Sequence, residues 1–398
     1  MIEQVRKNFN DAFTKEKYSK LLNELDAPHP GAIEFRIAET PVFIPRKFKD
    51  MIIEACEGIV DTILDPKFNK FTEDAIPAQL RAPNENNHSH FIAFDFGICK
   101  NEDGEYEPQL IEMQGFPSLF AYQAMLDEEY RNNFSIPEGF TSYLGNYTKE
   151  SYVEELKEII IGDAPVDEVV LLELFPHKQK TRIDFYATAD KLGIPVVCLT
   201  EISREGRKLF YKKDGTLKPI RRIYNRVIFD ELEQQSAEVI EMGKIFFEDL
   251  DVEWIPHPNW FYRISKYTMP FLRNPFVPKT YFLNEIHQPP TDLENYVLKP
   301  LFSFAGQGVL IDVTMEEIEK VKDPVNWILQ QKVSYADVIA TPDGPAKCEI
   351  RIFYFWKDGE PRPKPAMNLA RLSKGKMIGV RYNKDKEWVG GSIAYFER

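Results

Sequence analysis

Two lysines and a glycine loop in the last third of the chain have the residue types that bind phosphate groups. Lys266 lies near the start of SKYTMPFLRNPFVPKT (265–280), and Lys299 ends the segment YVLK. The loop after Lys299 contains Gly306 and Gly308, which let backbone N–H groups approach phosphate oxygens closely. A lysine ammonium is a flexible point charge that suits phosphates. Each lysine alone also fits a solvated surface position, so the phosphate site depends on both lysines together with the loop.

Two later segments supply groups that belong beside such a site. The motif GxxxxGK[ST] is absent, which argues against a P-loop enzyme. The segment NWILQQKV (326–333) is expected to form a β-edge with free backbone groups, or alternatively a half-buried amphipathic strand. The segment CEIRIFYF (348–355) is expected to form a strand, and its alternation places Glu349 and Arg351 on one face. The alternative for this pair is a salt bridge on an exposed face.

Carboxylates also occur much earlier, in two segments that predict a β-hairpin over residues 88–114. HFIAFDFGI and PQLIEMQ flank a turn with an Asp-Gly pair, which is a strong hairpin signal. In the second strand Glu112 and Gln114 share one face, and in the first strand Asp95 points away from its apolar neighbours. Asp95 and Glu112 could therefore face one Mg²⁺ ion, which prefers oxygen ligands. The alternative is a hairpin whose polar side chains face solvent.

Several kinds of secondary structure must position these segments. Residues 1–80 are expected to be mainly helical, since apolar residues recur at helical spacing in stretches such as 48–64. Residues 166–235 alternate strand and helix and predict a small βαβ unit with a parallel sheet. The proline-rich stretch 275–290 is expected to be an extended linker or an edge strand. From Tyr296 onward the pattern predicts antiparallel strands with intervening helices.

The composition limits the class of protein. The 398 residues are 43% hydrophobic and 28% charged, which is typical of a globular protein with two or three domains. The net charge of −13 argues against a protein that coats nucleic acid. The four cysteines form no CxxC pair, and His88 and His90 lack a third ligand, so neither disulfides nor a zinc site is expected. The absence of an apolar leader and of any stretch of about 18 apolar residues predicts a cytoplasmic protein with no membrane partner.

In order and spacing, the lysines, loop and strands resemble the ATP-grasp superfamily of carboxylate–amine ligases. Ordinary members carry their metal-binding residues near the C-terminus, but this chain ends in WVGGSIAYFER without them. The hairpin FIAFDFGICKNEDGEYEPQLIEMQGFPS (91–118) resembles the missing metal segment. A metal hairpin ahead of the lysines is the order of circularly permuted members, such as eukaryotic-type glutathione synthetase and the synthetase domain of glutathionylspermidine synthase. The resemblance covers most of residues 88–398, with one departure at Gln114, where the family has Asn.

This resemblance implies an α/β (α+β) protein with a circularly permuted ATP-grasp fold and an inserted parallel βαβ substrate domain. The implied parts are an N-terminal helical segment (1–87), a metal-site hairpin region of the ATP-grasp C-subdomain (88–150), a βαβ substrate-side domain (151–258) and a nucleotide-binding domain (259–398).

The resemblance also implies ATP and Mg²⁺ as cofactors and assigns residues to them. The expected ATP-binding residues are Lys266, Lys299, Ser303, Gly306, Gln307, Gly308, Gln330, Gln331, Lys332 and Val333. The backbone of 331–333 would hold adenine, with Gln330 turned toward the nucleotide and Tyr335 or Asp337 near the ribose. The expected metal ligands are Asp95, Glu112 and Gln114.

Further residues are expected at the reacting groups. The catalytic residues implied are Arg371, Arg351 and Glu349. The substrate residues implied are Asn383, Gly390 and Gly391, with the glycine pair in a loop that closes over substrate. Arg226 is expected at the substrate cleft as well, because loops at the C-terminal ends of parallel strands are the usual ligand positions.

The implied reaction is the ATP-dependent joining of a small-molecule carboxylate to an amine. The γ-phosphoryl group passes to the carboxylate, and the amine then attacks the acylphosphate. Two alternatives remain: a nucleotide-binding protein of the same fold without ligase activity, and a small-molecule kinase whose phosphorylated product is stable. The sequence identifies neither the acid nor the amine, nor the oligomeric state.

Overall fold

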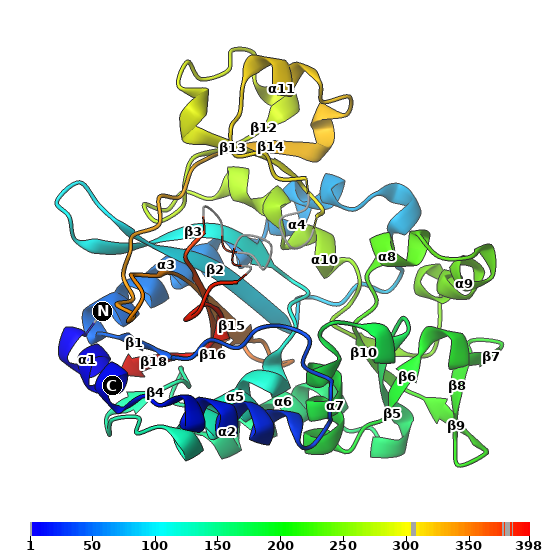
Figure 1. The fold of residues 1–398 in the computed structure, drawn as a ribbon. Helices are drawn as coiled ribbons and strands as arrows, with labels where there is room; N and C mark the ends of the chain where they lie inside the picture. The colour runs from blue at the N-terminus through cyan, green and yellow to red at the C-terminus, as the bar shows by residue number, and fades with distance from the viewer. Residues whose placement is uncertain (1, 304–307, 376–377, 379–382, 384) are drawn as a thin grey trace.

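The computed structural model describes residues 2–303, 308–375, 378, 383 and 385–398 (Figure 1). At its centre lies a five-stranded antiparallel sheet in the order β17-β16-β15-β2-β3. The strands are β2 (Phe91–Lys100), β3 (Tyr106–Gln114), β15 (Lys347–Phe355), β16 (Lys364–Ser373) and β17 (Gly390–Ser392). The predicted hairpin is therefore β2–β3, and it pairs directly with the strand that carries Glu349 and Arg351.

Strand β3 contains one extra residue opposite β2. Asp95 pairs with Glu112, whereas the next residue, Phe96, pairs with Leu110. Ile111 is thus the additional residue of a β-bulge, which interrupts the ladder beside Asp95.

Helices cover both faces of the central sheet (Figure 1). One face packs against a layer of three helices, α2 (Lys15–Asp26), α5 (Phe120–Asn133) and α6 (Lys149–Ile161). The opposite face packs against one long helix, α3 (Arg46–Ile63). The ring of Phe120 on α5 packs at a tilt against Phe91 and Phe353 of the sheet. On the opposite face, Phe94 and Ile350 share a core with α3.

The face that packs on α5 changes character along the strands. Alternate residues of a strand share a face, so Phe353, Arg351 and Glu349 all project from the same side of β15. Phe353 belongs to the apolar core beneath α5, whereas Arg351 and Glu349 lie beyond it with Asp95. Helix packing therefore ends where the charged residues begin.

A second sheet is parallel throughout and has the order β11-β10-β5-β6. Its elements are β5 (Val169–Glu173), α7 (Arg182–Leu192), β6 (Val196–Cys198), β10 (Arg222–Asn225) and β11 (Glu253–Ile255). Helix α7 connects the parallel strands β5 and β6, so the predicted βαβ unit is confirmed. A small antiparallel sheet of β7 (Ser203–Glu205), β8 (Lys208–Lys213) and β9 (Thr216–Ile220) extends from it.

A third sheet lies above the central sheet in Figure 1. It consists of β12 (Thr280–Phe282), β13 (Tyr296–Pro300) and β14 (Trp327–Gln331), with helix α11 (Met315–Glu319) beside it. The order is β12-β14-β13, and Leu298 and Leu329 contribute to its own small core. The proline-rich stretch contains β12, which is an edge strand as expected.

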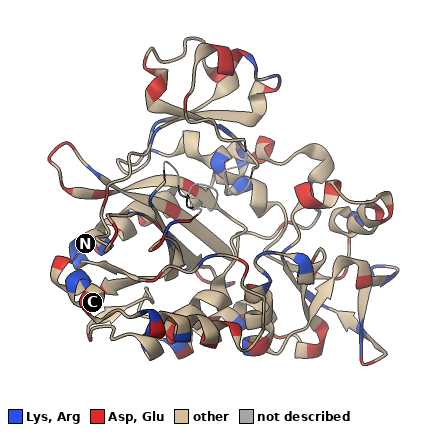
Figure 2. Ribbon diagram, in the orientation of Figure 1, with Lys and Arg blue, Asp and Glu red and all other residues tan. Residues whose placement is uncertain are grey.

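The first and last parts of the chain lie together (Figure 1). Strand β1 (Val42–Ile44) and strand β18 (Ala394–Glu397) pair in a three-stranded sheet, and β4 (Phe140–Thr141) completes it on the other side of β18. The remaining helices are α1 (Glu3–Ala12), α4 (Phe68–Phe71), α8 (Phe229–Glu233), α9 (Ala237–Met242) and α10 (Trp260–Arg263). Acidic and basic positions are interspersed over the ribbon (Figure 2). Within the described residues, no helix has the length and apolar character needed to cross a membrane.

Candidate functional site

The charged half of the α5 face brings Asp95, Glu112 and Arg351 together. Strand pairing places Asp95 between Glu112 on β3 and Arg351 on β15. Arg351 Nε and Nη2 donate to the two oxygens of Asp95, each at 2.6 Å. Arg351 Nη2 also lies 3.9 Å from Glu112 Oε1. The three side chains form a row across three strands, and within it Asp95 and Arg351 make a buried bidentate ion pair.

A second row lies one alternating position further along the same strands. Glu349 pairs with Arg371 on β16 and with Gly97 on β2. Arg371 Nη2 contacts the Glu349 carboxylate and donates to Asp95 Oδ2 at 2.8 Å. The hydroxyl of Tyr335 donates to Glu349 Oε2 at 3.1 Å. Arg371 thus joins the two rows, as a guanidinium can because it offers several donors.

Both predicted phosphate-binding lysines reach this cluster. Lys266 begins a 3₁₀ helix, η7 (Lys266–Phe271), and its Nζ lies 3.9 Å from Glu112 Oε2. The same Nζ donates to the carbonyl of Ser303 at 2.8 Å. Lys299 on β13 donates to the carbonyl of Ile111 at 3.1 Å, which is the bulge residue of β3. Both lysines are buried, so the bulge supplies an acceptor that a desolvated ammonium needs.

Burial and neighbouring charges shift the titration of these groups. Burial raises the pKa of Glu112, but Lys266 and Arg351 outweigh that effect and bring the pKa to about 2. Burial lowers the pKa of Lys299 to about 8, although Glu112 opposes the change. Burial also lowers the pKa of Lys266 and raises the pKa of Glu349. Near neutral pH, Glu112 is therefore ionised and Lys299 is charged but close to its transition.

The expected metal ligands differ in how open they are to a cation. Glu112 is 28% exposed, and its Oε1 accepts a hydrogen bond from Gln114 Nε2 at 2.9 Å. The oxygens of Asp95, in contrast, accept hydrogen bonds from Arg351 and Arg371. Asp95 therefore anchors the two arginines, and its role as a metal ligand stays a prediction. Glu112 and the amide oxygen of Gln114 are the groups that fit Mg²⁺ here.

Strand β14 differs from the expected β-edge with free backbone groups. It is the middle strand of its sheet, between β12 and β13. The backbone N–H of Gln331 donates to the carbonyl of Lys279, and that of Lys332 donates to the carbonyl of Asn295. The expectation failed because the edge strand β12 pairs with β14, and the sequence pattern does not indicate which strand an edge strand joins.

Side chains near β14 face two directions. Gln330 is buried, and its Nε2 lies 3.4 Å from the carbonyl of Leu110 on β3. Gln331 and Lys332 line a groove of about 1070 Å³ that runs along β12, with Tyr281 and Lys100 also at its edge. This groove lies beside the predicted adenine segment and is not lined by the charged cluster.

The loop after Lys299 is described only at its ends. Gly306 and Gln307 lie outside the described residues. The carbonyl of Ser303 accepts a hydrogen bond from the ammonium of Lys266. The Ser303 hydroxyl is buried without a hydrogen-bond partner in the described part of the chain. Gly308 has a φ of 74°, a backbone conformation that favours glycine.

Two of the expected substrate residues contact other parts of the protein. Arg226 is buried, donates to the carbonyl of Pro117 at 2.8 Å and lies over the ring of Phe116 at 4.6 Å. Asn383 accepts a hydrogen bond from the backbone N–H of Lys374 at 2.9 Å. Neither residue belongs to the charged cluster, and their substrate role stays a prediction.

The glycine pair near the C-terminus forms strand β17 and is not the loop that was expected. Gly391 pairs with Arg371, and Gly390 pairs with Leu372, which places the pair at the edge of the central sheet. On the other side, the N–H of Gly391 donates to the carbonyl of Arg36 at 2.8 Å. A Cβ on Gly390 would lie 2.4 Å from the same carbonyl oxygen. Close approach of two backbones explains these glycines without a mobile loop.

The segment that contains Val333 and Tyr335 covers the region around Glu349, which was not predicted from the sequence. Val333 and Tyr335 lie over Gly97, where a Cβ would come within 2.8 Å and 2.9 Å of their side chains. Tyr335 was expected near the ribose, but its hydroxyl contacts Glu349. The signal was a single glycine inside an otherwise bulky buried strand, which marks a close approach of another segment.

Comparison with known proteins provides a structural likeness. The sequence matches no protein-family profile and no curated protein at a significant level. Among solved structures, the chain is similar to a glutathione synthetase-like effector from Globodera pallida in its apo form, with a TM-score of 0.59 and 11% identity. The match covers 95% of this chain and 96% of the effector. The chain therefore has a mixed α/β fold similar to that of a glutathione synthetase-like protein.

Proposed function

We propose that this protein is an ATP-dependent ligase that joins a small-molecule carboxylate to an amine through an acylphosphate. The observation that carries the proposal is the charged cluster on the central sheet. Four cationic and three carboxylate side chains from separate parts of the chain meet there; they are Lys266, Lys299, Arg351, Arg371, Asp95, Glu112 and Glu349. The likeness to a glutathione synthetase-like protein supports the same reading.

The lysines are proposed to bind the phosphates of ATP. Their ammonium groups meet at Glu112, and each holds a backbone carbonyl that a phosphate oxygen can replace as partner. Mg²⁺, when bound with ATP, would neutralise phosphate charge. Glu112 and Gln114 are the residues proposed to hold it, because Glu112 is ionised and partly exposed. The circularly permuted ATP-grasp arrangement belongs to this proposal.

Arg371 is proposed to act on the transferring phosphoryl group. Its side chain is 36% exposed, in contrast to the buried Arg351, so it lies at the open side of the cluster. Asp95 and Glu349 hold its guanidinium in place. A fixed cation beside the developing charge stabilises the transition state without reorganisation. The proposed substrates are a small carboxylate and an amine.

A second candidate is a nucleotide-binding protein of the same fold without ligase activity. Two contacts favour it: the arginines occupy Asp95, and the Gln114 amide donates to Glu112. In that case the cluster would bind ATP but would not turn it over.

The experiment that tests the ligase is ADP release with Mg²⁺-ATP and pooled carboxylic acids, amino acids, peptides and polyamines. A ligase should release ADP only when an acid and an amine are both present. Glu112→Gln should lose this activity, while Glu105→Gln, in the turn before the same strand, should keep it because that carboxylate is exposed and pairs with Lys47. ATP binding without ADP release for every pair would establish the second candidate, and a stable phosphorylated acid would indicate a kinase.

A further inference from the structure

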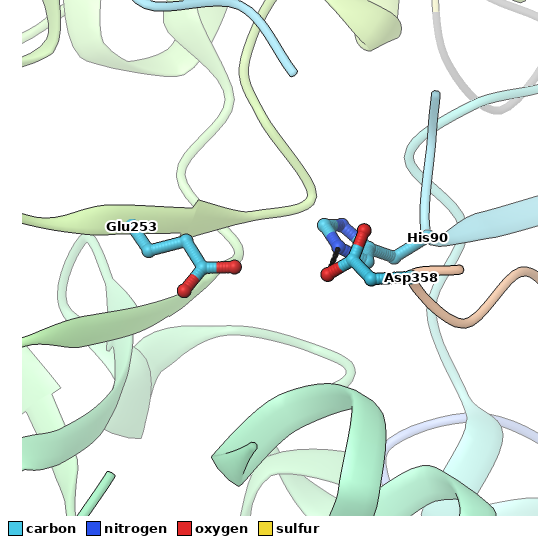
Figure 3. Close-up of side chains that lie close together, drawn as sticks. All are labelled: His90, Glu253 and Asp358. Carbon is cyan, nitrogen blue, oxygen red and sulfur yellow. Dashed lines mark hydrogen bonds and ion pairs between the residues drawn. The ribbon is translucent and has the colours of Figure 1, made fainter. Parts of the chain in front are cut away.

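A second cluster of ligand-type side chains lies away from the charged face. Figure 3 shows Glu253 directed toward His90 and Asp358. One ligand atom of each residue lies within 4.8 Å of the other two. The three residues come from different elements: His90 directly precedes β2, Glu253 begins β11, and Asp358 lies in the turn between β15 and β16. The third ligand that the sequence lacked for the His88/His90 pair is therefore supplied by a distant turn.

The turn holds Asp358 between two imidazoles. Asp358 Oδ2 lies 3.3 Å from His90 Nε2, and Oδ1 lies 3.3 Å from His88 Nε2. Trp356, in the same turn, stacks on the His88 ring at a centroid distance of 4.3 Å and an angle of 11°. His90 Nε2 and Asp358 form a hydrogen bond, and the two imidazoles lower the pKa of the Asp358 carboxyl, so the carboxylate stays ionised beside both rings.

The histidine and the glutamate each keep a free ligand atom. His90 is buried, and its Nδ1 has no hydrogen-bond partner in the described part of the chain, so the ring is not fixed by a second contact. Arg222 binds Oε2 of Glu253 and also donates to the carbonyl of Ile159, which orients the carboxylate. A cavity of about 120 Å³ lined by Glu253 and His257 adjoins the cluster.

We infer that His90, Glu253 and Asp358 bind one divalent transition-metal cation of the Zn²⁺ class. Imidazole nitrogen with carboxylate oxygens is a donor set that suits zinc. Ligand atoms around tetrahedral zinc lie about 3.3 Å apart, so the three groups need only a small closure. Glu253 can supply it, because its side chain is 46% exposed. His88 is the residue placed to complete the coordination from the other side of Asp358.

The consequence of this site is a link between two sheets. His90 and Asp358 directly flank strands of the central sheet, and Glu253 belongs to the parallel sheet. A bound cation would tie the parallel sheet to the sheet that carries the charged cluster. This inference does not depend on the proposed function, because none of its ligands belongs to that cluster.

The test is calorimetric titration of the EDTA-treated, dialysed full-length protein with ZnCl₂, with Co²⁺ absorption as a report on coordination. The native chain should bind one Zn²⁺ with a Kd in the micromolar range or below, and Zn²⁺ should raise its Tm. Asp358→Asn and Glu253→Gln should each weaken binding at least ten-fold. Both positions are exposed, so equal Tm values without metal should confirm that the variants fold.

Two matched controls separate this site from others. Asp190 pairs with His29 at 2.7 Å on the surface, so Asp190→Asn removes a carboxylate beside a single histidine and should leave zinc binding unchanged. Glu105→Gln should also leave it unchanged, since that exposed carboxylate pairs with Lys47 outside both clusters. Absence of saturable binding to the native chain would overturn the inference. Native affinity in Asp358→Asn or in Glu253→Gln would overturn it as well.

Discussion

Raising the pH from 7 to 9 should weaken ATP binding through Lys299. Burial lowers the pKa of this lysine to about 8, so its ammonium is mostly charged at pH 7 and mostly neutral at pH 9. The terminal phosphate, with a second pKa of about 6, is already about nine-tenths ionised at pH 7 and gains little charge by pH 9. The contact between Lys299 and the phosphates therefore loses its cation, while the charge of ATP changes little.

The size of the effect follows from the fraction of protonated lysine. That fraction falls from about 0.9 at pH 7 to about 0.1 at pH 9, and only this form is competent to pair with phosphate. The apparent Kd for ATP should rise about ten-fold, which is about 1.4 kcal/mol. Replacing the lysine by alanine should weaken binding at pH 7 by about 1.5–3 kcal/mol, the range of a charged hydrogen bond.

Calorimetric titration with Mg²⁺-ATP at pH 7, 8 and 9 measures this change. Lys299→Arg is the matched control, because a guanidinium stays charged throughout. Its affinity should vary little with pH, and that of Lys299→Ala should be low and flat. A native affinity that is constant from pH 7 to 9, or an equal fall in Lys299→Arg, would refute the reasoning.

Four other outcomes are expected. Arg371→Ala should bind ATP nearly normally but lose about two or more orders of magnitude in ADP release, as for the loss of one transition-state donor; native turnover would exclude the role. Asp95→Asn should lower the free energy of unfolding by about 3–5 kcal/mol, because it leaves Arg351 buried without its counter-charge, and chemical denaturation will measure it. Gly97→Ala should lower the Tm, since its Cβ clashes with the covering segment. The free energy of unfolding should rise between pH 8 and 10.5, by up to about 3 kcal/mol, because the unfolded chain holds the Lys299 proton more tightly; Lys299→Met should remove this rise.

Local patterns predicted the parts of the site that lie within one hairpin or one strand. Alternation placed Glu349 and Arg351 on one face of β15, and an Asp-Gly pair marked the turn of β2–β3, where Gly104 has a φ of 79°. These features depend on the strand period and on glycine conformation, which neighbouring residues determine. The pairing of Asp95 with Arg351 across β2 and β15 is a long-range contact that alternation alone does not specify.

Three features depended on long-range partners and were missed or misjudged. The middle position of β14 depends on its pairing with β12, and the sequence predicted an edge strand there without indicating its partner. Gly390 is in a strand because Arg36 approaches it from the start of the chain. Asp95 anchors arginines because Arg371 arrives from β16. In each case the deciding group lies far away in the sequence, where residue type and spacing carry little information.

The balance of charge explains why this cluster suits an anion. Four cationic side chains meet three carboxylates, and Asp95 is already shared by two guanidiniums. Glu112 interacts with both lysines, but burial lowers the pKa of Lys299 by more than Glu112 raises it, and the nearby Lys266 lowers it further. A phosphate group would supply the missing negative charge and return that pKa toward its ordinary value. The shortage of negative charge beside these buried cations costs stability in the free protein. The same shortage favours binding of a polyphosphate.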